Sequence, residues 1–218
     1  MVIFDCDGVL VDTMPVADQT CVRFFNQMGL AFSIDDFRFI SSGRDLVGLC
    51  QYCCDLAGVS FNADMPEQIR SEIVSALKDN VVAIPGAVDA VRRLDEKGKQ
   101  LCVASSGSVS KMKMTLGSVG LLSIFEDLLF SAQDCGRGKP YPDVFLTAAK
   151  TMEVDVRHCL VVEDTLEGVQ AAKAAGMEVL GFVRDFYAPH DEMGRAGAQL
   201  FDNMEELEEM IDFFERSL

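Results

Sequence analysis

The chain has 218 residues, of which 49% are hydrophobic and 25% are charged, a composition typical of globular proteins. Its formal net charge of −16 disfavours nucleic acids and anionic membranes as partners, because both attract basic surfaces. No apolar run approaches the ~20 residues of a membrane span, and no signal peptide precedes the first expected strand. We therefore expect a cytoplasmic protein whose eight cysteines are reduced thiols.

Residues 2–10 join an apolar run to two aspartates. The apolar residues 2–4 predict a buried strand, since they show no polar alternation. Asp5 and Asp7 are two positions apart, so their side chains should project from the same edge of a sheet. Adjacent carboxylates repel each other, and Mg²⁺, a hard cation that takes oxygen ligands, would relieve that repulsion. A plain Asp-Gly turn explains the same residues without a metal, so this stretch alone does not decide between the two.

Residues 14–82 are predicted to be helical throughout. Apolar residues recur at helical spacing in stretches that begin near residues 14, 33, 45 and 66. Ser33 and Asp36 resemble a capping box, and Gly29 and Gly58 stand where helices should end. The cysteines at positions 50, 53 and 54 have no second ligand pair for zinc and fall at helical spacing, so we expect them to pack in a core.

From residue 84 onward, apolar stretches alternate with helical patterns. Strands are expected near residues 101–104, 128–130, 160–162 and 179–183, with helices between them and an acidic amphipathic helix at 204–214. This alternation predicts an α/β fold, a Rossmann-like parallel sheet formed by residues 1–13 and 83–218. Residues 14–82 would be a helical bundle inserted into it as a second domain. In such folds, ligands bind at the carboxyl ends of the strands.

Polar residues stand where several of the expected strands end. Besides Asp5 and Asp7, they are Ser105, Glu163 and Asp164, and Lys139 joins them from a loop. Taken singly, each is explained as a helix cap or a solvated side chain. Taken together, they suit a phosphate monoester, which carries about two negative charges near neutral pH. Carboxylates approach such a group only with a bridging divalent cation and with a lysine and a hydroxyl on its oxygens. One carboxylate can then attack phosphorus while a second transfers the proton.

Four motifs in the expected order carry a resemblance to a known family. They are D-x-D-G-V-L-x-D at residues 5–12, V-A-S-S-G at 103–107, G-K-P-x-P-D at 138–143 and V-V-E-D-T-x-x-G at 161–168. With them the chain resembles the phosphotransferases of the haloacid dehalogenase superfamily, in the subgroup with a helical cap inserted after the first motif. The match spans nearly the whole chain.

The resemblance implies a role for each of these residues. Asp5 is the nucleophile, and Asp7 is the general acid and base. The expected Mg²⁺ ligands are the Asp5 side chain, the Asp7 carbonyl, Asp164 and, directly or through water, Glu163. The expected phosphate-binding groups are Ser105, Lys139 and the backbone amides near Gly8, Ser106 and Gly107. Because the dehalogenase branch lacks an equivalent of Asp7, phosphoryl transfer is favoured over dehalogenation.

The leading functional hypothesis is a phosphatase that hydrolyses a small phosphorylated metabolite, a sugar phosphate or a sugar-acid phosphate such as 6-phosphogluconate. The alternative is a mutase of the β-phosphoglucomutase type. Those relatives carry a cap histidine ten positions after the acid/base aspartate, and Ala17 occupies that position here. Arg44 falls where the mutases hold an arginine that binds the far end of the substrate, and Arg70 is a second candidate in the insert. A solvated arginine explains Arg44 equally well.

A hypothesis from another class is a phosphate-receiving signalling module. Receiver domains also place an acid pair, a hydroxyl and a lysine around Mg²⁺ on a parallel sheet. They are shorter, place the phosphorylated aspartate after a later strand and have no helical insert. Asp7, at a spacing suited to hydrolysing an acyl phosphate, favours turnover over a stored signal.

Overall fold

The computed structural model describes residues 1–41, 44–184 and 190–217. The chain divides into two compact units. One is formed by residues 1–12 and 82–218, and the other by residues 13–81. The domain boundaries expected from the sequence lie one residue away from these. Each unit is described by itself below.

The first unit is built on a six-stranded sheet in which every neighbouring pair of strands is parallel. In spatial order the strands are β5 (Leu129–Ser131), β4 (Leu101–Ser105), β1 (Val2–Phe4), β6 (Leu160–Glu163), β7 (Glu178–Phe182) and β8 (Gln199–Phe201). Phe4, the last residue of β1, pairs with Val103 on one side and with Val162 on the other. The chain therefore leaves β1, β4 and β6 at one edge of the sheet. The predicted α/β class with a parallel sheet is confirmed.

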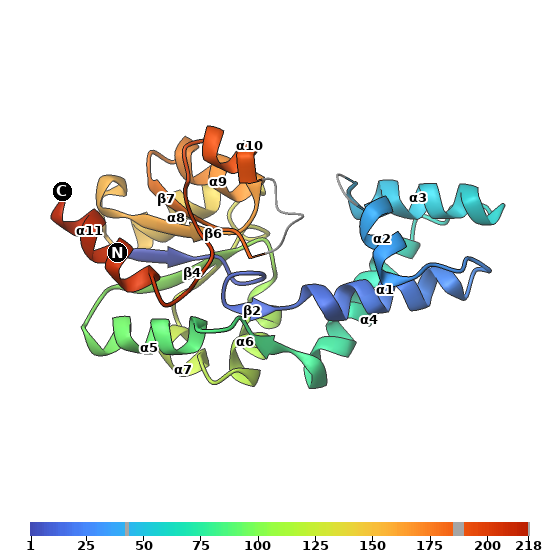
Figure 1. The fold of residues 1–218 in the computed structure, drawn as a ribbon, viewed down its shortest axis with the longest axis horizontal. Coiled ribbons are helices and arrows are strands. Elements are labelled where there is room, and N and C mark those ends of the chain that lie inside the picture. Colours follow the sequence, from blue (N-terminus) through green and yellow to red (C-terminus); the bar gives the residue numbers. More distant parts are fainter. Residues whose placement is uncertain (42–43, 185–189, 218) are drawn as a thin grey trace. The chain divides into compact units, whose positions relative to one another are not determined.

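Helices cover both faces of this sheet, as Figure 1 shows. On one face lie α8 (Asp143–Thr151), α9 (Leu166–Ala174) and α10 (His190–Arg195), and the other face carries α5 (Ala87–Glu96) and the short α7 (Leu122–Phe125). The remaining helical elements of the unit are α6 (Val109–Ser118), η1 (Val156–His158) and α11 (Leu207–Arg216). Helices therefore form the connections between the parallel strands, which cannot be joined by a tight turn.

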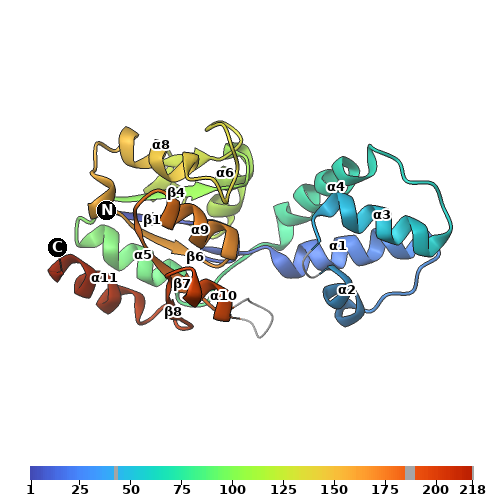
Figure 2. The same cartoon turned by 90° about the horizontal axis from the view of Figure 1, so that it is seen from above.

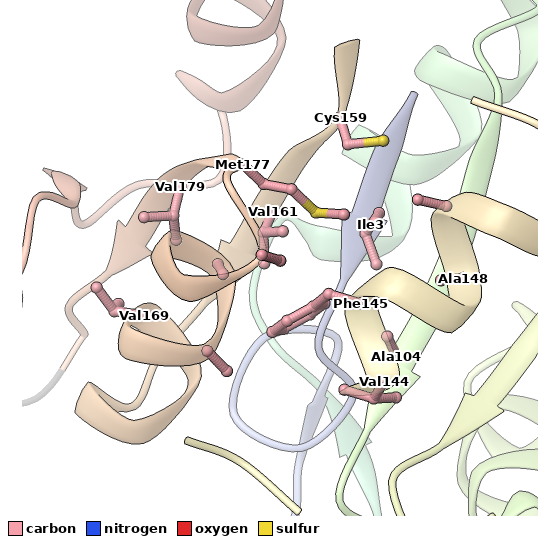
Figure 3. Packing of buried hydrophobic residues seen from close by; sticks show 14 of the residues in the cluster. Ile3, Ala104, Val144, Phe145, Ala148, Cys159, Val161, Val169, Met177 and Val179 are labelled. Atoms are coloured by element: carbon pink, nitrogen blue, oxygen red, sulfur yellow. The ribbon is translucent and has the colours of Figure 1, made fainter. Parts of the chain in front are cut away.

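The core beneath α8 and α9 fixes the central strands (Figure 3). Ile3 and Val161, on neighbouring strands, are fully buried together with Phe145 of α8 and Val169 of α9. The opposite face holds Phe4, whose ring meets that of Phe125 edge to face at 6.2 Å. Burying side chains of this kind contributes about 1.5–3 kcal/mol each. The central strands are therefore apolar on both faces, and their polar residues are confined to the strand ends.

Two very short strands form a separate sheet where the chain leaves and re-enters this unit. In it, β2 (Val11–Asp12) pairs antiparallel with β3 (Val82–Ala83). The amide of Ile84 also donates a hydrogen bond to the carbonyl of Leu10, at 3.0 Å. Neither strand was predicted from the sequence, because two residues are too few for a periodic pattern.

In its described residues, 13–41 and 44–81, the second unit contains four helices (Figure 2): α1 (Met14–Asn26), α2 (Ile34–Ser41), α3 (Leu46–Ala57) and α4 (Met65–Asn80). The predicted capping box is confirmed, because the Asp36 amide donates to Ser33 Oγ and the Ser33 amide donates to Asp36 Oδ2, both at 3.1 Å. The core is formed by buried side chains of all four helices, namely Cys21, Phe25, Phe37, Leu49, Cys50, Cys53 and Ile69.

The cysteines of the chain are all free thiols, as expected from the sequence. Burial raises the pKa of Cys21 to about 12 and that of Cys50 and Cys53 to about 11. These groups therefore behave as small apolar side chains at neutral pH. No helix within the described ranges is long and apolar enough to cross a membrane.

Candidate active site

The loop that follows β1 carries the two aspartates of the first motif. The amide of Asp5 donates to the carbonyl of Val162 on β6 at 2.9 Å, so Asp5 continues the sheet, and its side chain is buried. At Gly8 the chain turns back, with φ of 85°. A Cβ atom at this position would lie 1.9 Å from Asp164 Oδ2. Only glycine fits there, so this loop and the end of β6 are in direct contact.

Lys139 lies in the loop before α8 and connects two of the predicted acids. Its Nζ donates to Asp5 Oδ1, to Glu163 Oε1 at 2.5 Å and to the carbonyl of Ala104 at 3.2 Å. The Lys139 side chain is only 6% exposed. Burial by itself would lower the pKa of this lysine, but the two carboxylates outweigh it and hold the pKa above its usual range. Lys139 is therefore a permanent buried cation at the centre of the site.

Asp5 has a raised pKa. Burial is the largest cause, Lys139 opposes it, and the charges of Glu163 and Asp7 add to it, so that together they raise the pKa of Asp5 to about 7. The carboxyl group is thus crowded by other acids, and a second cation beside it would favour its ionised form.

Both carboxylate oxygens of Glu163 accept hydrogen bonds from nearby residues. While Oε1 faces Lys139, Oε2 accepts hydrogen bonds at 2.8 Å from both the amide and the hydroxyl of Thr165. A Cβ atom at Gly168 would lie 1.9 Å from the Glu163 carboxyl group, so α9 approaches as closely as its backbone allows. Both carboxylate oxygens are therefore engaged, and Glu163 holds Lys139 in place.

Asp164 provides the test of whether these residues suit a metal ion. Its Oδ1 is buried and has no hydrogen-bond partner. Burial first, and then the charges of Glu163 and Asp5, raise the pKa of Asp164 well above its usual range. A buried carboxylate oxygen without a donor, close to other acids, is suited to a hard cation. Elsewhere in the described part of the chain, as here, no three His, Cys, Asp or Glu side chains are already grouped to hold one.

The loop from Ser105 to Gly107 lies at the end of β4. The buried Ser105 Oγ accepts from the Gly107 amide at 3.2 Å. Ser131, the last residue of β5, and Gln133 hold the other side of the loop. Ser131 Oγ donates to the Gly107 carbonyl at 2.8 Å, and Gln133 Nε2 donates to the Ser106 carbonyl at 3.2 Å. These two hydrogen bonds fix the carbonyls of Gly107 and Ser106. The loop leads directly into the N-terminus of α6, where backbone amides favour anions.

Asp7 contacts a residue that the sequence analysis did not identify. Lys111 Nζ lies 2.7 Å from Asp7 Oδ2, and the two side chains are 21% and 28% exposed. Lys111 is the third residue of α6. A cation in the first helical turn is disfavoured by the helix dipole, and that local conflict is the signal that could have identified it.

The two arginines named from the sequence lie in the helical unit. The Arg44 guanidinium lies 4.6 Å from the centre of the Tyr52 ring and donates to the Ile40 carbonyl. Arg70 pairs with Glu67 on α4 at 3.4 Å. Ser42 and Gly43, which precede Arg44, fall outside the described residues. The structure therefore brings together the residues predicted on the strand ends and gives the arginines partners within their own unit.

Comparison with known proteins identifies the family. The family model for haloacid dehalogenase-like hydrolases matches residues 1–176. A 6-phosphogluconate phosphatase of Escherichia coli strain K12 is 32% identical over 192 residues, which cover 88% of this chain and 84% of that protein. The chain belongs to the haloacid dehalogenase-like hydrolases. The predicted resemblance and the predicted enzyme class, a hydrolase of this family, are confirmed.

Solved structures agree with this assignment. A conserved haloacid dehalogenase-like protein from Agrobacterium tumefaciens strain C58 has a TM-score of 0.84 and 30% identity, and the match covers 98% of each chain. A β-phosphoglucomutase candidate from Thermotoga maritima has a TM-score of 0.82 and 25% identity, with 100% of this chain and 99% of that one covered. The family thus includes a relative named as a phosphatase and a structural neighbour from the mutase branch.

Proposed function

We propose that the protein is a Mg²⁺-dependent phosphatase that hydrolyses a small phosphorylated metabolite, a sugar phosphate or sugar-acid phosphate of the 6-phosphogluconate kind. The observation that carries the proposal is the buried pair of Asp5 and Lys139, with Asp7 at the more exposed side. The name and similarity of the E. coli 6-phosphogluconate phosphatase support the substrate class.

The expected reaction has two steps. In the first, a carboxylate oxygen of Asp5 attacks phosphorus and the bond from phosphorus to the leaving oxygen breaks, while Asp7 donates its proton to that oxygen. In the second, Asp7 takes a proton from water, which attacks the aspartyl phosphate; inorganic phosphate leaves and the Asp5 carboxylate is restored. Asp7 suits both steps because its side chain is partly exposed, whereas that of Asp5 is 8% exposed.

The other residues neutralise charge and orient the phosphate. Lys139 and Ser105, with the amides around Ser106 and Gly107, would bind the non-bridging oxygens of the phosphoryl group. Asp5, Asp164 and the carbonyl of Asp7 would hold Mg²⁺, and Glu163 would act through Lys139, since both of its oxygens are engaged. Mg²⁺ supplies charge neutralisation of the phosphate against this acidic site.

A screen of sugar phosphates and 6-phosphogluconate, with Mg²⁺ or with EDTA, tests the proposal. We expect phosphate release that requires Mg²⁺ and is lost in Asp5→Asn. Asp89→Asn, a change of the same kind at an exposed position of α5, should keep full activity. Activity that survives in EDTA would contradict the role of the metal, and an active Asp5→Asn would contradict the role of the nucleophile.

The mutase alternative is favoured by the Thermotoga maritima neighbour. The same screen separates it, because a mutase would convert β-glucose 1-phosphate to glucose 6-phosphate without net release of phosphate. Ala17, in the place of the cap histidine, favours hydrolysis.

A further inference from the structure

Lys111 is the second cation of the site and has no role in the proposed reaction so far. Its Nζ lies 2.7 Å from Asp7 Oδ2, within the range of a charge-assisted hydrogen bond. Lys139 is held between Asp5 and Glu163. The two lysines therefore serve different carboxylates, one beneath the nucleophile and one beside the acid/base group.

The backbone of Lys111 is fixed by the start of α6. Ser108 is the N-cap residue, and its Oγ accepts from the Lys111 amide at 3.3 Å. The Lys111 carbonyl accepts from the hydroxyl of the buried Thr115 at 3.1 Å. Since a cation in this turn opposes the helix dipole, the helix itself gains nothing from a lysine here. What a lysine at this position does provide is the contact of its ammonium group with Asp7.

Gly107 has no side chain and lies close to the side chains of three other residues. A Cβ atom there would lie 3.5 Å from Lys111 Cδ, 3.6 Å from Asp7 Oδ2 and 3.7 Å from Ser105 Oγ. The stem of Lys111 thus passes along the Ser105–Gly107 loop before its ammonium group reaches Asp7. Because the loop is itself tied to Ser131 and Gln133, the position of Lys111 is set by rigid elements on both sides.

We propose that Lys111 is a positioning residue that holds the Asp7 carboxylate beside Ser105, in the orientation in which Asp7 transfers the proton. This rests on the proposed function, because it assigns Lys111 a role through Asp7. Loss of the ammonium group leaves Asp7 present but removes the contact that orients its Oδ2 atom. The turnover number then falls, while the binding of the phosphate group, which Lys139 and the loop amides carry, stays as it is.

Variants of the full chain test this in steady-state kinetics with p-nitrophenyl phosphate and Mg²⁺. Lys111→Met keeps the length of the stem and removes the charge. Misplacing a catalytic group by a small distance costs on the order of 10–100-fold, so we expect kcat to fall by about that factor with KM within about twofold. Lys113→Met makes the same change at an exposed position of the same helix and should match the wild type.

The double variant Asp7→Asn/Lys111→Met separates positioning from direct substrate binding. If Lys111 acts through Asp7, adding Lys111→Met to Asp7→Asn lowers kcat no further, because residues that act as a unit are not additive. If Lys111 binds the phosphate itself, the two losses multiply, KM rises in Lys111→Met, and calorimetric titration with inorganic phosphate shows weaker binding. Any of these three results overturns the proposal.

Failure of this inference is distinguishable from failure of the proposed function. A wild type without phosphatase activity refutes the function. A wild type that is active, with a slow Asp7→Asn and a Lys111→Met as fast as Lys113→Met, refutes only the role of Lys111. Thermal unfolding checks that the variants fold. If Lys111→Met does not fold, Lys111→Gln replaces it, because the glutamine side chain lacks the charge and is one bond shorter than the lysine that reaches Asp7. The same loss of kcat is expected.

Discussion

Replacing Gly8 by alanine tests the contact between the loop after β1 and Asp164. Gly8 has φ of 85°, and an added Cβ would lie 1.9 Å from Asp164 Oδ2 and 2.6 Å from Asp164 Cγ. The left-handed backbone alone costs a residue other than glycine about 1–2 kcal/mol. Displacing a buried side chain from a packed site adds about 1–3 kcal/mol. We therefore expect Gly8→Ala to lower stability by about 2–5 kcal/mol in total.

Gly98→Ala is the matched control because it isolates the backbone contribution. Gly98 lies in the same unit with φ of 69°, and nothing lies within 4 Å of an added Cβ. The difference between the two variants is then the cost of displacing Asp164, about 1–3 kcal/mol, or about 2–12 °C in Tm for a chain of this length. Differential scanning calorimetry measures it.

The activity of the two variants provides a second measure. Gly8→Ala should lose Mg²⁺-dependent activity at temperatures where it is folded, because Asp164 is moved, whereas Gly98→Ala should keep it. Equal Tm values for the two variants, together with a fully active Gly8→Ala, would refute the close approach of Gly8 to Asp164.

Lys139→Met should lower stability by about 3–5 kcal/mol, because it leaves the carboxylates of Asp5 and Glu163 buried without a cation. Calorimetry checks this, and a Tm equal to that of the wild type would contradict the buried ion pairs. Mg²⁺ should raise the Tm of the wild type by binding only the folded state, and a comparable rise in Asp164→Asn would argue against Asp164 as a ligand. In the native protein at pH 8, Ellman's reagent should react readily with one thiol, that of the partly exposed Cys135, because burial keeps the others inaccessible; rapid reaction of several thiols would contradict their burial.

The fold was predictable wherever the pattern of apolar residues is long enough to repeat. Residues 101–104 and 160–162 were predicted as strands because they are unbroken apolar runs, and all of them are buried. The strand β8 was not, since two of its three residues, Gln199 and Leu200, are exposed. The helix α10 was missed for a similar reason: of its six residues, Met193 alone is buried. These elements are defined by their neighbours in space rather than by their own sequence.

The candidate site was predictable to the extent that it depends on strand ends. Asp5, Ser105 and Glu163 lie at one edge because β1, β4 and β6 are adjacent and parallel. The sequence did not predict which acids pair with Lys139 and which remain available to a metal ion, because this depends on which carboxylates face Lys139 in space. Glu163, expected near the metal, has both oxygens engaged by Lys139 and Thr165. Lys111 was missed because its unfavourable place in the first turn of a helix does not show which acid it contacts.

The short sheet of β2 and β3 joins the two segments that lead into and out of the helical unit. Val11 pairs with Ala83 and Asp12 with Val82, so the two points where the insert departs and returns are neighbours held by the α/β unit itself. An insertion at such a point leaves the order and register of the six parallel strands unchanged. Substitution, recombination or exchange of residues 13–81 can therefore alter the insert while the residues around Asp5 keep their frame. A family built on this plan can diversify the inserted unit and leave the α/β unit unchanged.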